Sequence, residues 1–138
     1  MTNLVEINNL NIRFTGDRTV HAVNDLSLSL GEGEVLGLLG ESGSGKTVSA
    51  MSILRLLPNS ASHPTGEILF EGSDILKMNG AQLRNIRGRR ISIIFQEPMT
   101  SLNPLHTIEK QVGEIIRLHQ ALPDDTTRER VIELLTKV

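Results

Sequence analysis

The eight residues Gly-Glu-Ser-Gly-Ser-Gly-Lys-Thr at positions 40–47 have the types and the spacing of a loop that binds a polyphosphate. Gly40, Gly43 and Gly45 permit backbone angles that a β-carbon obstructs, so main-chain amides can approach phosphate oxygens closely. Lys46 is placed to reach the terminal phosphates, and the hydroxyl of Thr47 is placed to bind Mg²⁺. We therefore expect residues 40–47 to bind a nucleoside triphosphate. The alternative is a Gly/Ser turn that binds nothing.

A loop of this kind needs a strand before it and a helix after it, and the sequence predicts both. The residues before the loop form a short apolar run, 35–39, which is typical of a fully buried parallel strand. The residues after it predict a helix that points its positive end at the anion and that Pro58 stops. The apolar positions of this helix are Ala50, Met51, Leu54 and Leu57.

The rest of the first hundred residues alternates between strands and turns. Residues 3–14 and 20–30 are expected to be strands joined by a turn at Gly16-Asp17, and Leu26, Leu28 and Leu30 have the period of a half-buried strand. Residues 58–66 are rich in Pro, Ser and Gly, which predicts a surface loop before a short strand at 67–70. A short helix is expected after Asn79-Gly80, and residues 91–95 are expected to form another strand.

Beyond Pro104 the pattern becomes helical. One apolar stripe runs from Ile108 to Leu122 and a second begins at Val131, with Pro123-Asp124-Asp125 expected to end the first helix and cap the next. The second stripe continues to Val138 without a helix stop signal, which favours a truncated chain.

Composition excludes several classes of protein. The 138 residues suffice for one domain or part of one, and a net charge of -2 argues against a nucleic-acid partner. There is no cysteine, hence no disulfide framework and no thiolate metal site. The sequence has neither an apolar stretch long enough to span a bilayer nor a secretory signal. The four histidines have no metal-ligand spacing, and we expect them on the surface.

A second constellation follows the strand expected at 91–95. Gln96 stands where a side chain at the carboxyl edge of a sheet can face the phosphate site, and residues 97–104 read Glu-Pro-Met-Thr-Ser-Leu-Asn-Pro. With the phosphate loop, this chain resembles the ATP-binding subunit of ABC transporters. Residues 52–58 and 95–107 are similar to the subfamily that imports di- and oligopeptides, nickel and microcin C.

The resemblance implies an α/β fold, a P-loop NTPase (RecA-like) core with an antiparallel β subdomain in residues 1–103 and the start of an α-helical subdomain in 104–138. It implies catalytic roles for Lys46 and Gln96, and Mg²⁺ contacts for Thr47 and Gln96. Adenine stacking is expected from Phe14, with Val20 or His21 as alternatives. The implied nucleotide contacts are Phe14, Gly40, Glu41, Ser42, Gly43, Ser44, Gly45, Lys46, Thr47 and Val48.

The resemblance also implies partners. These are ATP, membrane-spanning permease subunits, a second ATP-binding domain and, indirectly, a peptide-binding protein, at the cytoplasmic face of the membrane. The family's signature motif, second acidic strand, catalytic glutamate and switch histidine have no match in this chain. A transporter ATPase and a fragment that binds nucleotide without hydrolysing it therefore remain open. A small kinase and a DNA-repair ATPase of the same family are further alternatives. We also expect an open apolar edge at residues 35–39 and poor folding of the isolated chain.

Overall fold

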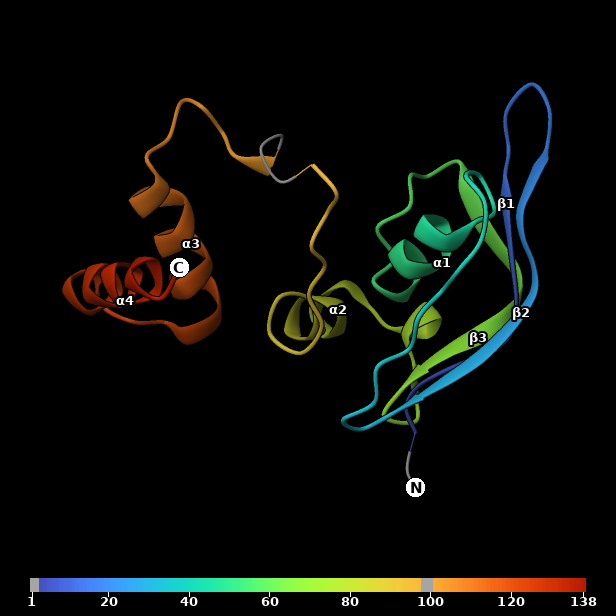
Figure 1. Ribbon diagram of the computed structural model, residues 1–138, viewed down its shortest axis with the longest axis horizontal. Helices are drawn as coiled ribbons and strands as arrows, with labels where there is room; N and C mark the ends of the chain where they lie inside the picture. The colour runs from blue at the N-terminus through green and yellow to red at the C-terminus, as the bar shows by residue number, and fades with distance from the viewer. Residues whose placement is uncertain (1–2, 98–100) are drawn as a thin grey trace. The chain divides into compact units, whose positions relative to one another are not determined.

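The computed structural model describes residues 3–97 and 101–138, which form two compact units divided between residues 84 and 85 (Figure 1). The first unit contains an antiparallel sheet and a short helix, and the second contains a pair of helices. The predicted domain boundary at residue 103 concerns the architecture of the family and stays a prediction.

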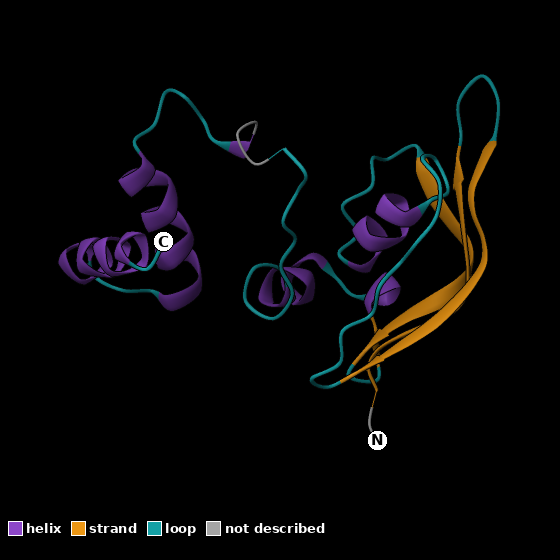
Figure 2. Cartoon of the chain, in the orientation of Figure 1, coloured by secondary structure: helices purple, strands orange, loops and turns teal. Residues whose placement is uncertain are grey.

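The sheet of the first unit has four antiparallel strands in the order β2-β1-β3-β4 (Figure 2). Their bounds are Asn3–Phe14 for β1, Val20–Gly31 for β2, Ala61–Phe70 for β3 and Ser73–Asp74 for β4. The strands predicted at 3–14 and 20–30 are thus confirmed. In β2 the half-buried Leu26, Leu28 and Leu30 alternate with exposed residues, as their period indicates.

The core of this unit lies on one face of β1. Val5, Ile7, Leu10 and Ile12 are buried there, and an irregularity in pairing between Ile7 and Leu10 shifts the alternation by one residue. Other buried residues of the unit are Val23, Leu54, Ile68, Phe70, Ile75 and Leu83. Beside this irregularity the main chain of β3 comes very close to that of β1, since a Cβ on Gly66 would lie 2.5 Å from the Cα of Leu10. Only glycine fits that position, and its φ of +94° is one that glycine adopts at little cost.

The predicted loop at 58–66 is wrong from residue 61 on, because β3 begins at Ala61. Ala61 and Ser62 pair with Phe14 and Arg13 of β1. Hydrogen bonding to an available strand edge outweighs the turn-forming composition of this segment.

The first unit also contains helix α1 (Lys46–Ile53) and the 3-10 turn η1 (Ile75–Lys77). Helix α2 (Gly80–Ile86) spans the division between the two units. The helix expected after Asn79-Gly80 is confirmed. Helix α1 ends at Ile53, five residues before the predicted stop at Pro58, and Arg55 has a positive φ of 50°. Inside α1 the buried positions are Ser49 and Ser52, whose hydroxyls bond to carbonyls one turn back. Of the predicted apolar positions, Leu54 is buried just beyond the helix, Met51 and Leu57 are half-buried, and Ala50 is exposed.

The two strands predicted at 35–39 and 91–95 are wrong for the structure as it stands. Neither segment is in a strand, and Val35, Leu39 and Ile94 are 94%, 98% and 95% exposed. An isolated bridge between Arg87 and Ile91 is the pairing recorded there. A parallel strand forms only beside a hydrogen-bonded neighbour; the described residues supply no strand neighbour for 35–39, and 91–95 has only the single bridge at Ile91.

The second unit contains the two predicted helices, α3 (Ile108–Gln120) and α4 (Asp124–Thr136). Thr107 caps α3, its hydroxyl accepting from the amide of Lys110. The helices pack through a small residue, since a Cβ on Gly113 would lie 3.3 Å from Cγ2 of Thr127. No helix in the described part of the chain is long and apolar enough to cross a bilayer.

Candidate functional site: a phosphate loop at the start of helix α1

Residues 40–45 form a turn, exposed from 40 to 44, that leads directly into α1, which begins with Lys46 and Thr47. The amide of Ser44 donates to the carbonyl of Glu41 at 3.3 Å, which closes the turn. Gly43 and Gly45 have φ values of +79° and +90°, in the left-handed region that the sequence predicts for glycines of such a loop. The turn and the helix that follows it, both predicted from the sequence, are therefore present in the structure.

Strand β2 supports the end of the loop that joins α1. An added Cβ on Gly45 would lie 2.5 Å from the carbonyl oxygen of Ala22 and 3.2 Å from the side chain of Val23. The amide of Ser49 donates to the carbonyl of Gly45 at 2.8 Å, closing the first turn of α1. Ala22 and Val23 thus belong to the site, although no spacing in the sequence marks them, because their role depends on how the loop meets the sheet.

Lys46 folds its side chain back into the turn. Its Nζ donates to the carbonyls of Gly40 and Glu41 at 2.7 and 2.6 Å and to Oγ of Ser44 at 3.1 Å. An ammonium group has three donors, so these contacts occupy all of them. The positive charge therefore lies inside the curve of the loop, where an anion seated on the loop would meet it.

Helix α1 adds to this positive potential. The first amides of a helix have no partner within it, and those of Lys46, Thr47 and Val48 occupy these positions. The first turn contains no acidic residue that would offset the helix dipole. An ammonium group, unpaired amides and a helix N-terminus meet at one exposed turn, which is the chemistry that binds phosphate oxygens.

A divalent cation fits this loop only in company with a phosphate. The exposed Thr47 would supply one hydroxyl oxygen, and no group of three or more His, Cys, Asp or Glu in the described ranges is placed to hold a metal. Mg²⁺ commonly takes one or two protein ligands and completes its octahedron with phosphate oxygens and water. The residues present fit such a site, with Thr47 as the protein ligand.

The three candidates for adenine stacking lie near the supported end of the loop. Phe14 pairs with Val20, and Arg13 pairs with His21, which directly precedes Ala22 in β2. Phe14 is half-buried, whereas Val20 is 57% exposed and His21 is exposed. The stacking residue stays a prediction among these three.

Gln96 belongs to the second unit, where it is exposed. Its contact with Mg²⁺ or the attacking water stays a prediction. Positions 98–100 of the segment after it lie outside the described residues.

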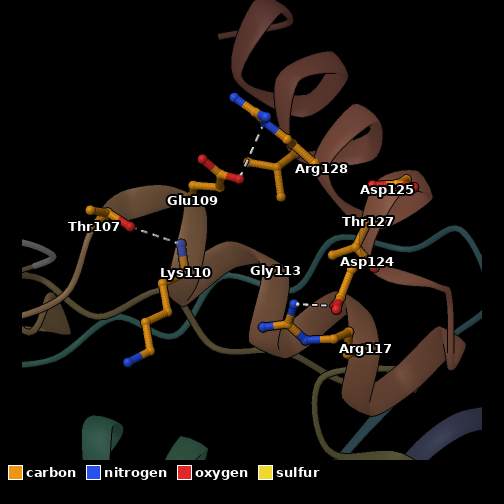
Figure 3. A pocket seen from close by; sticks show the side chains of 10 residues that line it. Thr107, Glu109, Lys110, Gly113, Arg117, Asp124, Asp125, Thr127 and Arg128 are labelled. Atoms are coloured by element: carbon orange, nitrogen blue, oxygen red, sulfur yellow. Dashed lines mark hydrogen bonds and ion pairs between the residues drawn. The ribbon is translucent and has the colours of Figure 1, made fainter.

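The second unit has a hollow of about 480 Å³ between α3 and α4, lined mainly by charged side chains (Figure 3). The charges are paired across it: Arg117 contacts Asp124 at 3.1 Å and Arg128 contacts Glu109 at 3.5 Å. The predicted cap segment Pro123-Asp124-Asp125 does stand at the start of α4: the cap position is Pro123, and no side chain makes a cap hydrogen bond. Both carboxylates lie in the first turn, where they offset the helix dipole.

One histidine of the first unit has a perturbed titration. Burial, and then the nearby charge of Arg55, lower the pKa of His63 below its ordinary value. Its Nε2 lies 3.4 Å from Oγ of the buried Ser52 on α1. His63 is half-buried, so the expectation that every histidine lies on the surface is wrong for this residue.

Comparison with known proteins identifies the family. A sequence profile described as ABC transporter matches residues 23–138. The chain belongs to the ABC transporter family. The resemblance that the phosphate loop and the segment around Gln96 indicate is therefore confirmed.

Relatives of this ABC protein include several transport ATP-binding proteins. The chain is 54% identical to the peptidoglycan transport ATP-binding protein YejF of Agrobacterium fabrum, over 98% of the chain and 25% of that protein. It is 44% identical to the probable D,D-dipeptide transport ATP-binding protein DdpD of Escherichia coli, over 98% and 42%. It is 39% identical to the oligopeptide transport ATP-binding protein OppD of Bacillus subtilis, over 100% and 39%. The chain thus spans a quarter to about two fifths of these relatives.

The fold is also that of the family. A dimeric bacterial ABC transporter cassette matches with a TM-score of 0.76 and 25% identity, over 96% of this chain and 56% of the other. A related structure, described as bound to ADP and phosphate, has the same TM-score and 24% identity. The predicted α/β cassette fold with its antiparallel sheet is confirmed in part of its length, although the two buried strands are not formed.

Proposed function

We propose that this chain is the nucleotide-binding part of an ATPase that powers peptide import through an ABC transporter. The observation that carries this proposal is the convergence of the Lys46 ammonium, the N-terminus of α1 and the glycine turn on one exposed site. The transport ATP-binding proteins among its relatives support peptides as the cargo.

In the proposed site the triphosphate lies on the amides of residues 43–48, and Lys46 exchanges carbonyl contacts for phosphate oxygens. Thr47 holds Mg²⁺, which neutralises charge on the β- and γ-phosphates when it is bound. Ser42 adds a hydroxyl near the γ-phosphate. Water attacks the γ-phosphate in line, and the loop's contribution is positioning and charge stabilisation.

The partners and the location belong to the same proposal. A second ATP-binding domain closes over the nucleotide, and permease subunits receive that closure at the cytoplasmic face of the membrane. A peptide-binding protein delivers the cargo to the permease. The dimeric state of a cassette with this fold supports the pairing of two nucleotide-binding domains.

For residues 1–138 taken alone we propose binding without turnover. No residue matches the catalytic glutamate, the second acidic strand, the signature motif or the switch histidine of the family. Without them no group orients the attacking water or completes the metal site.

Calorimetric titration with MgATP tests the binding. Replacing Lys46 with alanine removes the ammonium inside the loop, so the affinity should fall by at least about tenfold. Lys137→Ala is the matched control, because this exposed lysine pairs with Glu133 near the end of α4 and the charge change is the same. Equal binding by both variants would refute the proposal.

Phosphate release in the presence of MgATP separates the two forms of the function. We expect none above the buffer rate. A turnover of about one per second that disappears in Lys46→Ala would refute the binding-only proposal and show that the chain is an active ATPase.

A further inference from the structure

The first unit contains a hollow of about 240 Å³ that the phosphate loop does not share. Its walls come from the segment after α1 and from the start of β3, and they consist of Arg55, Leu57, Pro58, Asn59, Ala61 and His63. Among the described residues, this lining contains two groups that can carry positive charge and no carboxylate. A hollow in which a few polar groups converge is the usual form of a small-molecule site. We call it the Arg55–His63 hollow.

Arg55 is held at this hollow in an unusual backbone conformation. Its φ of 50° lies in the left-handed region, which residues with a β-carbon seldom adopt. Its amide donates to the carbonyl of Ser52 at 2.9 Å, and its Nη1 donates to the carbonyl of Met78 at 2.7 Å. Backbone strain of this kind is concentrated at ligand sites, and here it fixes a guanidinium group in the wall of the hollow.

The half-buried His63 has one of its two ring nitrogens engaged. The hydroxyl of Ser52 donates to the carbonyl of Val48 at 2.9 Å, so its oxygen accepts from Nε2 of His63 at 3.4 Å. Nδ1 is therefore the nitrogen that gains a proton on acidification. Burial, and then the charge of Arg55, lower the pKa of His63, because a second positive charge beside the guanidinium is unfavourable.

We propose that the Arg55–His63 hollow binds a small inorganic oxyanion between the guanidinium of Arg55 and the protonated imidazole of His63. An anion offsets the repulsion between these two groups, and hydrogen bonds from arginine and protonated histidine to an oxyanion are among the strongest that side chains form. The exposed Asn59 supplies an amide donor to the same hollow. The site follows the last residue of α1, whereas the phosphate loop precedes the first.

The carboxyl end of α1 opposes an anion, because the last carbonyls of a helix carry partial negative charge. This effect is reduced here, since the carbonyls of Met51 and Ser52 accept from the amides of Leu56 and Arg55 at 3.0 and 2.9 Å. Arg55 is exposed, so water competes for its guanidinium. We therefore expect a dissociation constant of about 1–10 mM.

The other elements packed around His63 add no negative charge. Strand β1 places Arg13 opposite Ser62, the residue before His63 in β3. Helix α1 contributes the hydroxyl of Ser52, which does not titrate. Arg55 and Arg13 keep their charge throughout the accessible pH range. The pH dependence of anion binding therefore depends on His63.

Sulfate is the probe, because it stays a dianion from weakly acidic to weakly basic pH. The ring resonances of His63 in the full chain, identified by their loss in His63→Gln, are followed by NMR while sulfate replaces chloride at constant ionic strength. We expect a saturable shift. The affinity at about pH 5.5 should exceed that at about pH 8 by at least about fivefold, because sulfate binds the protonated ring.

A matched pair of arginine variants identifies the site. Arg55→Gln removes the guanidinium and should weaken sulfate binding by at least about tenfold. Arg89→Gln removes the same charge from an exposed position in the second unit and should change the affinity by less than about twofold. Circular dichroism checks that both variants fold. If Arg55→Gln is unfolded, Arg55→Lys replaces it, and the loss of the planar fork should weaken binding by at least about threefold.

The phosphate loop has affinity for the same chemistry, so a third variant separates the two sites. Lys46→Ala removes the ammonium of the loop and should leave the sulfate response of His63 unchanged. Loss of that response would mean that His63 senses an anion in the loop, which would overturn the inference. Glycerol 3-phosphate should bind no more tightly than phosphate, and tighter binding would overturn the assignment to a free ion.

The absence of a saturable shift at His63 would refute the site, as would equal affinities in Arg55→Gln and Arg89→Gln. An affinity that does not change with pH would refute the role of His63. None of these measurements uses MgATP. The proposed function can therefore fail while the oxyanion site stands, and the reverse.

Discussion

The run 35–39 is richer in apolar residues than strand β1, yet β1 is buried and the run 35–39 is exposed. In β1, Ile7, Leu10 and Ile12 are almost completely buried, and the strand as a whole pairs with β2 on one side and β3 on the other. In the run 35–39, Val35 and Leu39 are almost completely exposed and form no strand. An antiparallel neighbour needs only a short turn, here residues 15–19, whereas a parallel neighbour needs a crossover of a dozen or more residues. A segment with the composition of a strand therefore forms a strand only where the fold places a hydrogen-bonding strand beside it.

The largest expected difference in stability is between two alanine substitutions, one in β1 and one in the run 35–39. Ile7→Ala should lower the free energy of unfolding by about 2–5 kcal/mol, because it leaves a cavity in the core of the sheet. Val35→Ala should change it by less than about 0.5 kcal/mol, because Val35 touches little. Urea unfolding followed by circular dichroism measures both, since the chain lacks Trp and Tyr. Equal losses would mean that the run 35–39 is packed in solution.

Two glycine substitutions sharpen the comparison, one at Gly45 in the phosphate loop and one at Gly37 in the exposed run before it. Gly45→Ala forces a Cβ to within 2.5 Å of the Ala22 carbonyl at a positive φ, which should cost about 1–3 kcal/mol and weaken MgATP binding. Gly37→Ala places its Cβ in open space and should be nearly neutral. Thermal unfolding and MgATP titration of both variants check this. A large loss of stability in Gly37→Ala would show that the run 35–39 is packed in solution.

The smallest effect concerns pH. His63 has a lowered pKa in the folded chain, so below pH 6.5 the unfolded chain binds more protons than the folded one. Wild-type stability should therefore fall relative to His63→Gln as the pH drops through 6.5 towards the folded pKa, and the two should run parallel above it. The difference should stay below about 0.5 kcal/mol, because the ring is only half-buried. Unfolding midpoints at several pH values measure it, and a wild type that gains stability on acidification would contradict it.

Much of the site was predictable, because its pattern is local. The spacing of three glycines, Lys46 and Thr47 within eight residues predicts the turn and the helix that follows it. The strands 3–14 and 20–30 and the helices after Asn79-Gly80 and Pro104 follow from short-range periodicity in the same way. The start of β3 at Ala61 was not predictable, because pairing with β1 overrides a turn-rich composition.

The amino-acid sequence alone predicted the polyphosphate-binding loop and indicated the family, because such a loop consists of contiguous residues whose types and spacing set its backbone conformation. Only the tertiary structure decided that Gly45 rests on Ala22, that β3 pairs with β1 from Ala61 on, and that the apolar run 35–39 lies exposed. These outcomes depend on contacts between segments distant in the chain. Contacts of that kind form where a neighbour is in reach, and the composition of one segment does not say which neighbours it will have.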